Sequence, residues 1–185
     1  GCPHPRHPIP TMGLQSSFDT NRDHLNTGAG TGKLIVDLSA FKIGGTPIGK
    51  EPWDGDFFAI SLSQDGVFEQ ESAGYELTSN DAVLKSTFIT LENFQGIFLI
   101  QDQVSPLSTQ TTKEKILTLF GAPYWTDLDD GEIIFFYEYQ GGSIELQFEF
   151  PDGQHLGFIT LMQNGVLSDA EQRKIYGVTK PWPTE

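Results

Sequence analysis

The residues best suited to chemistry are four polar side chains on two neighbouring predicted strands, namely Glu138, Glu145, Gln147 and Glu149. Polar and apolar residues alternate without a slip from Ser143 to Phe150, which is typical of a strand buried on one face only. If Gly141-Gly142 turns the chain before this strand, Glu138 pairs directly with Glu145. The pattern therefore predicts an antiparallel sheet with a carboxylate-rich outer face.

Two glutamates side by side on a sheet repel one another and destabilise the free protein. Three interpretations stay open: the pair is simply solvated, with lysine neighbours nearby; it binds a cation, an arginine or a basic partner; or it performs acid–base chemistry. The sequence favours a solvated or binding surface over a catalytic pair. We therefore treat Glu138, Glu145, Gln147 and Glu149 as candidate binding residues and assign no catalytic residue.

The elements around these strands are marked by clear start and stop signals. Thr111 or Thr112 can cap a helix that runs through Phe120 and ends at Gly121, since Pro123 bars its continuation. Three strands follow, at 132–139, 143–150 and 155–162. The acidic segment Asp127–Glu132 lacks the spacing of a calcium loop and is predicted to be a solvated turn.

The chain ends in a second predicted helix, Ser168 to Tyr176. Ser168 would be its N-cap, with Glu171 three residues later, as in a capping box. The tail that follows is expected to lay Trp182 into an apolar groove.

The first half of the chain reads as short strands after an irregular arm. Residues 1–32 are rich in proline and glycine and predict a flexible arm. The predicted strands are 34–38, 41–43, 57–62, 75–78, 85–91 and 97–102. We expect one α+β domain over 33–185, predominantly antiparallel sheet with one or two short helices packed on it. Its parts would be a β-rich part (33–105), a helix with a three-strand meander (111–162) and a C-terminal helix and tail (168–185).

Composition excludes several classes of function. The 185 residues include 25 Asp and Glu against 11 Lys and Arg, a net charge of −14. Such a chain repels nucleic acid, so a basic protein partner, or no charged partner at all, is expected. No run of 18 apolar residues and no signal peptide is found, which favours a cytoplasmic protein without a transmembrane segment.

Cys2 is the single cysteine, so no intrachain disulfide can form. Its place directly after Gly1 supports an alternative: the acylated cysteine of a bacterial envelope lipoprotein, with residues 3–32 as a spacer.

No motif for catalysis or cofactor binding is complete in this sequence. Gly28–Lys33 resembles a phosphate loop, but the first glycine and the final Ser or Thr of that motif are missing. Cys2, His4 and His7 fall short of the four ligands of a structural zinc site. With only His155 inside the predicted domain, a hydrolytic triad has no convincing base. We therefore expect a non-enzymatic protein with no cofactor and no metal.

Two segments resemble known families. Phe41-Lys-Ile-Gly-Gly-Thr-Pro-Ile-Gly49 and Ile116-Leu-Thr-Leu-Phe-Gly-Ala-Pro-Tyr124 are similar to segments of small uncharacterised bacterial proteins, some of which resemble immunity proteins from toxin loci. The helix, Gly-x-Pro and meander between Thr111 and Leu161 also resemble the SmpA/OmlA and β-lactamase-inhibitor-like repeat. That repeat opens with two helices, whereas one is found here. Both resemblances imply a non-enzymatic binding module, either immunity-type or lipoprotein.

Overall fold

The structure is a computed structural model that describes residues 33–50, 66–81 and 83–183. The predicted arm (1–32), with Cys2, and the predicted strand at 57–62 lie outside the described residues. Over the described ranges, antiparallel sheets dominate and the helices are few and short, which confirms the predicted α+β class.

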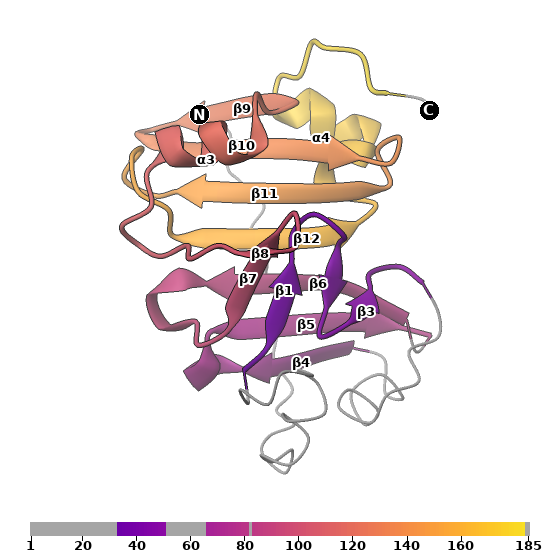
Figure 1. The fold of residues 1–185 in the computed structure, drawn as a ribbon. Coiled ribbons are helices and arrows are strands. Elements are labelled where there is room, and N and C mark those ends of the chain that lie inside the picture. Colours follow the sequence, from indigo (N-terminus) through magenta and orange to yellow (C-terminus); the bar gives the residue numbers. More distant parts are fainter. Residues whose placement is uncertain (1–32, 51–65, 82, 184–185) are drawn as a thin grey trace.

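The larger sheet has seven strands within the described residues, all antiparallel (Figure 1). In spatial order they are β4 (Gly66–Gln70), β5 (Tyr75–Asn80), β6 (Val83–Thr90), β12 (Phe158–Gln163), β11 (Ile144–Phe150), β10 (Glu132–Tyr139) and β9 (Trp125–Asp129). The pairing of β6 with β12 joins the two halves of the chain into one sheet.

The smaller sheet contains a departure from the predicted antiparallel meander. Its strands in order are β3 (Thr46–Pro47), β2 (Lys42–Ile43), β1 (Ile35–Asp37), β7 (Ile97–Ile100) and β8 (Gln103–Val104). β1 and β7 run parallel, with Val36 opposite Phe98. Parallel neighbours need a long connection, and here β4, β5 and β6 are part of it.

Helices begin close to where their caps predict. Helix α3 (Lys113–Phe120) is capped by the Thr112 side chain, which accepts a hydrogen bond from the Lys115 N–H, and it ends at Gly121 as predicted. The predicted Ser168 cap is wrong. A short 3₁₀ helix, η3 (Val166–Ser168), comes first, and Asp169 caps α4 (Ala170–Ile175). Two further 3₁₀ turns are η1 (Glu71–Ala73) and η2 (Leu91–Asn93).

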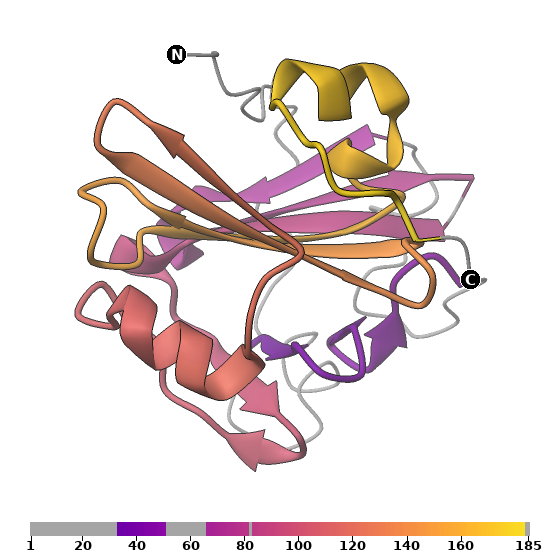
Figure 2. The ribbon, with the colours of Figure 1, turned by 90° about the horizontal axis from the view of Figure 1, so that it is seen from above.

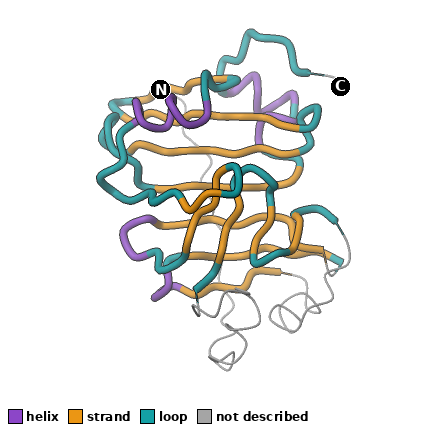
Figure 3. Tube along the Cα trace, in the orientation of Figure 1, coloured by secondary structure: helices purple, strands orange, loops and turns teal. Residues whose placement is uncertain are grey.

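The larger sheet is the middle of three layers. Figure 2 shows the smaller sheet and α3 on one side of it and α4 with the C-terminal tail on the other, and Figure 3 shows how short the helices are beside the strands. On the first side Leu146 and Phe148 pack with Val36, Phe98 and Ile116. We call the side toward α4 the second face of the larger sheet.

The second face carries its own apolar cluster, formed by Tyr124, Ile134, Phe136, Leu167 and Tyr176. As predicted, Trp182 packs on this cluster. Its ring meets the Tyr124 ring edge-on with centroids 5.3 Å apart. The Tyr124 hydroxyl donates to the carbonyl oxygen of Lys180 at 2.8 Å, which fixes the tail over the β10–β11 turn.

The predicted solvated turn over Asp127–Glu132 is wrong for most of its length. Trp125–Asp129 is strand β9, which pairs with β10, and only Asp130-Gly131 turns the chain. β9 is the edge strand of the sheet, and on it Leu128 is 70% exposed whereas Asp127 is only 8% exposed. Within the described ranges, none of the helices has the length and apolarity needed to cross a bilayer.

Burial on both sides of the larger sheet gives a direct test of the layered arrangement. We expect Phe136→Ala on the second face and Phe148→Ala on the first to lower the free energy of unfolding by about 3–5 kcal/mol each, because both rings are fully buried. Leu128→Ala should change it by about 0.5 kcal/mol or less. Denaturant titrations measure all three, and a Phe136→Ala effect as small as that of Leu128→Ala would contradict a second core.

Candidate functional site

The predicted strand register is confirmed, but the predicted exposure is wrong. Glu138 lies opposite Glu145 and Tyr139 opposite Ile144, as the Gly141-Gly142 turn implies. However, Glu145, Gln147 and Glu149 are only 1%, 5% and 7% exposed, and every residue of β11 is buried. Glu138 alone is half-buried. These four residues therefore do not form a solvent-facing surface.

Glu145 is held by three hydrogen-bond donors. Its carboxylate accepts from the backbone N–H of Val166 at 3.1 Å, from that of Leu167 at 2.9 Å and from the side-chain amide of Gln147 at 2.6 Å. Gly165 lies directly against it, so that a Cβ at this position would overlap with Glu145. The carboxylate thus satisfies the first N–H groups of η3, which would otherwise be unpaired.

Burial raises the pKa of Glu145, and the three donors act in the opposite direction because they favour the charged form. Such a network binds the C-terminal segment to the middle of the sheet. We interpret Glu145 as a structural residue that positions η3.

A glutamine at position 145 would keep the shape but replace one acceptor oxygen with an N–H donor facing other donors. We expect Glu145→Gln to lower the free energy of unfolding by about 1–3 kcal/mol. Glu138→Gln, at the half-buried cross-strand partner, is the matched control and should stay within about 0.5 kcal/mol. Equal effects in denaturant titrations would show that the contacts of Glu145 with η3 do not contribute to the free energy of unfolding.

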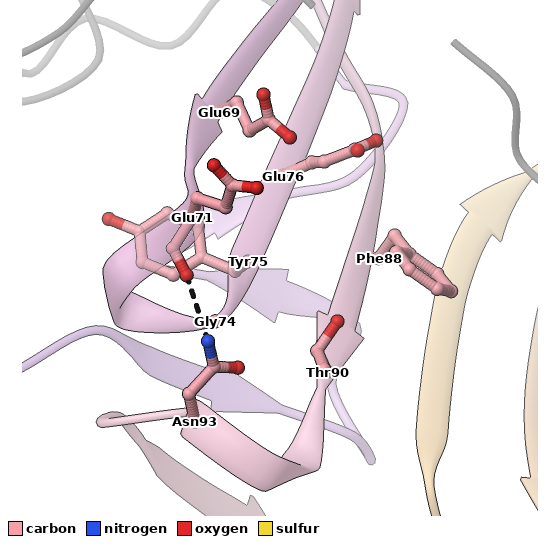
Figure 4. Close-up of a pocket in the computed structure, with 8 residues that line it drawn as sticks. All are labelled: Glu69, Glu71, Gly74, Tyr75, Glu76, Phe88, Thr90 and Asn93. Atoms are coloured by element: carbon pink, nitrogen blue, oxygen red, sulfur yellow. Dashed lines mark hydrogen bonds between the residues drawn. The ribbon is translucent and has the colours of Figure 1, made fainter.

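A second pair of opposed glutamates lies at the other end of the sheet and is accessible. Glu69 on β4 is directly opposite Glu76 on β5. Together with Glu71 they border a cavity of ≈ 280 Å³ that we call the acidic hollow (Figure 4). Its lining residues are Glu69, Glu71, Gly74, Tyr75, Glu76, Phe88, Thr90 and Asn93.

Local backbone geometry brings the three carboxylates together. Strand β4 ends in η1, which begins at Glu71, and the chain turns back through Gly74 at φ 82°. A Cβ at Gly74 would lie 2.6 Å from the backbone of Phe94, so only glycine fits there. The Asn93 side-chain amide donates to the Glu71 carbonyl oxygen at 3.1 Å and fixes the turn. Figure 4 shows Glu69, Glu71 and Glu76 grouped above this turn.

The pKa of Glu76 is raised, first by burial and then by the charge of Glu69. The carboxylates of Glu69 and Glu76 have no hydrogen-bond donor within the described part of the chain. This repulsion therefore persists in the free protein, in contrast to the satisfied carboxylate of Glu145.

An aromatic surface adjoins the acidic hollow. The rings of Phe88 on β6 and Phe158 on β12 stack with centroids 5.5 Å apart and an interplanar angle of 14°. Phe88 is the cross-strand neighbour of Glu76, and both phenylalanines are half-buried. Carboxylates beside an aromatic face suit a cationic side chain, above all the guanidinium of arginine. Among the described residues no group of three or more His, Cys, Asp or Glu is arranged to hold a metal ion.

Sequence reasoning missed this pair because it predicts a strand at 75–78 but none at Gly66–Gln70, where β4 lies. A signal was present. Ser72-Ala73 lies midway between Glu69 and Glu76 and is followed by Gly74, so a hairpin centred on Ser72-Ala73 would have paired the two glutamates in the same way that Gly141-Gly142 pairs Glu138 with Glu145.

Comparisons with known proteins add little. No protein-family model matches the chain, and no curated protein matches it. A crystal structure of a DUF4309 family protein (YjgB) from Bacillus subtilis is similar with a TM-score of 0.38 and 14% identity, over 64% of this chain and 82% of that one. A similarity of this strength supports no inference about function.

The raised pKa of Glu76 gives a pH test with a defined sign. The carboxyl should titrate above its ordinary value of 4.5, so its contribution to folding stability is present below 4.5 and is lost as pH rises through the raised pKa. Glu69→Gln should lower the pKa of Glu76 but not restore it fully, because burial is the larger cause. Side-chain NMR titration measures this, with Glu114→Gln on α3 as control. An unchanged Glu76 pKa in Glu69→Gln would show that the two charges do not interact.

Proposed function

We propose that this protein is a non-enzymatic protein-binding module that recognises a basic partner through the acidic hollow. The observation that carries the proposal is the Glu69–Glu76 pair. Two like charges face one another across neighbouring strands, at half-buried positions and without a hydrogen-bond donor among the residues that the structure describes. A sheet loses stability by keeping such a pair, and a cation from outside removes that repulsion.

The chemistry of the hollow favours arginine over lysine as the inserted side chain. A guanidinium can bond two carboxylate oxygens at once and stack on an aromatic ring, whereas an ammonium acts as a point charge. Glu69, Glu71 and Glu76 supply the oxygens, and Phe88 with its stacked neighbour Phe158 supplies the ring surface. The net charge of −14 attracts a basic partner from a distance.

Within this proposal the protein is a bacterial accessory protein of the immunity type, located in the cytoplasm. The resemblance of the segments at 41–49 and 116–124 supports it. The alternative is an envelope lipoprotein anchored through Cys2, supported by the Gly1-Cys2 sequence. Fractionation of cells that carry the intact gene separates the two proposals, because the first expects the protein in the cytosol and the second in the membrane fraction.

The test uses an arginine-rich peptide as probe and compares two double variants of equal charge. We expect Glu69→Gln/Glu76→Gln to leave the free protein as stable or slightly more stable and to weaken peptide binding about tenfold. Glu114→Gln/Glu171→Gln, at exposed positions on α3 and α4, should bind like wild type. Calorimetric titrations over a salt series measure both affinities.

Salt separates specific from general attraction in this experiment. Raising the salt concentration should weaken wild-type binding more than binding by Glu69→Gln/Glu76→Gln. If the two double variants lose affinity equally, overall charge rather than the acidic hollow attracts the peptide. If neither differs from wild type at any salt concentration, the proposed binding surface is wrong.

A further inference from the structure

A second cavity, of ≈ 420 Å³, lies on the first side of the larger sheet, between layers rather than on the second face. It is open to solvent on one side and bordered by the turn after β1, the turn after β7, the end of α3 and the turn after β10. Its aromatic lining is Phe41, Phe120 and Tyr139, and its polar lining is Ser39, Gln101 and Gln140. We call it the uncharged pocket.

The lining of this pocket has no charged residue, in contrast to the three glutamates of the acidic hollow. None of its lining residues is Asp, Glu, Lys, Arg or His, although the chain carries 25 acidic and 11 basic residues. Burial and the nearby Glu138 raise the pKa of Tyr139 to about 12, so its phenol stays neutral. A charged ligand would lose hydration here without meeting an oppositely charged lining residue, which favours neutral molecules.

The pocket walls are fixed before any ligand arrives. The carboxylate of Asp37 accepts from the backbone N–H groups of Ser39 at 3.0 Å and Ala40 at 2.8 Å, which shapes the turn after β1. The Ser39 hydroxyl oxygen then accepts from the Gln101 N–H at 2.8 Å and joins this turn to the turn after β7. The Phe41 and Tyr139 rings pack with centroids 4.9 Å apart. A preformed site lowers the entropy lost on binding.

Three lining residues adopt the left-handed backbone conformation that favours glycine or asparagine. These are Phe41 at φ 60°, Gln101 at φ 52° and Gln140 at φ 55°. Each occupies a turn where glycine would relieve the strain, and each lines the same pocket. Strain of this kind lowers the stability of the folded state and gathers at binding sites. Three such residues around one pocket therefore support a binding role for it.

We propose that the uncharged pocket binds a neutral small molecule that carries a flat ring. The ring would pack against Phe41, Phe120 and Tyr139 by offset or edge contact. Ser39, Gln101 and Gln140 supply hydrogen bonds at the rim and fix its orientation. This inference does not depend on the acidic hollow, which lies on the second face of the sheet.

Three probes that share one ring system and differ in charge test the proposal on the full chain. They are naphthylmethanol, naphthoate and naphthylmethylamine. We expect naphthylmethanol to give saturable backbone-amide shifts in NMR at Ser39, Gln101 and Gln140, and to bind at least about tenfold tighter than either charged probe. Equal binding of all three would overturn the assignment to neutral ligands, and absence of shifts at these amides would overturn the site.

A matched pair of variants on α3 locates the binding. Leu119→Trp fills the pocket and should abolish the shifts, whereas Leu117→Trp, at a position 37% exposed and outside the lining, should leave them unchanged. Thermal melts check that both variants fold. If one of them does not fold, the amide shifts of the wild-type protein at Ser39, Gln101 and Gln140 still decide whether the site is correct. Binding that survives in a folded Leu119→Trp would overturn the proposal. So would a concentration-dependent dimer lost in that variant while no probe binds, because the pocket would then be a contact between two copies.

Discussion

Strand β11 is buried on both faces, and the rest of the architecture follows from that constraint. A strand with alternating polar and apolar residues can be covered on both sides only if its polar side chains find partners inside the protein. Glu145 finds them in the backbone N–H groups of η3, and Gly165 leaves the space for this contact. The C-terminal segment is thereby fixed on the second face, where Leu167, Tyr176 and Trp182 complete a small core.

Among the described residues, that cover ends partway across the sheet, and this leaves a surface where partners can bind. The second apolar cluster gathers over β10 and its neighbours, while Glu69, Glu76 and Phe88 border an open hollow over β4 to β6. On the first side the smaller sheet and α3 leave the uncharged pocket between them. The two candidate sites thus lie on opposite sides of one sheet and differ in chemistry, one acidic and one neutral.

Local signals in the sequence predicted local structure well. The Gly141-Gly142 turn gave the correct register of β10 and β11, and Thr112 with Gly121 gave the correct bounds of α3. The predictions that were wrong concern contacts between distant parts of the chain. Period-two alternation shows which residues share a face but not whether a later segment covers it, so Glu145, Gln147 and Glu149 were wrongly expected in solvent. The parallel pairing of β1 with β7 likewise has no local signal, since β2 to β6 lie between these two strands in the sequence.

The two opposed glutamate pairs show why burial alone does not identify a functional carboxylate. Glu138–Glu145 and Glu69–Glu76 have the same cross-strand geometry, and in each pair burial raises the pKa of one member. The difference lies in the donors. Three hydrogen bonds within the chain satisfy Glu145, so its charge is already used in folding. No such donors reach Glu76 from the described residues, and its repulsion with Glu69 can be relieved by a cation from outside. The unsatisfied pair, rather than the more deeply buried one, is therefore the better candidate for binding.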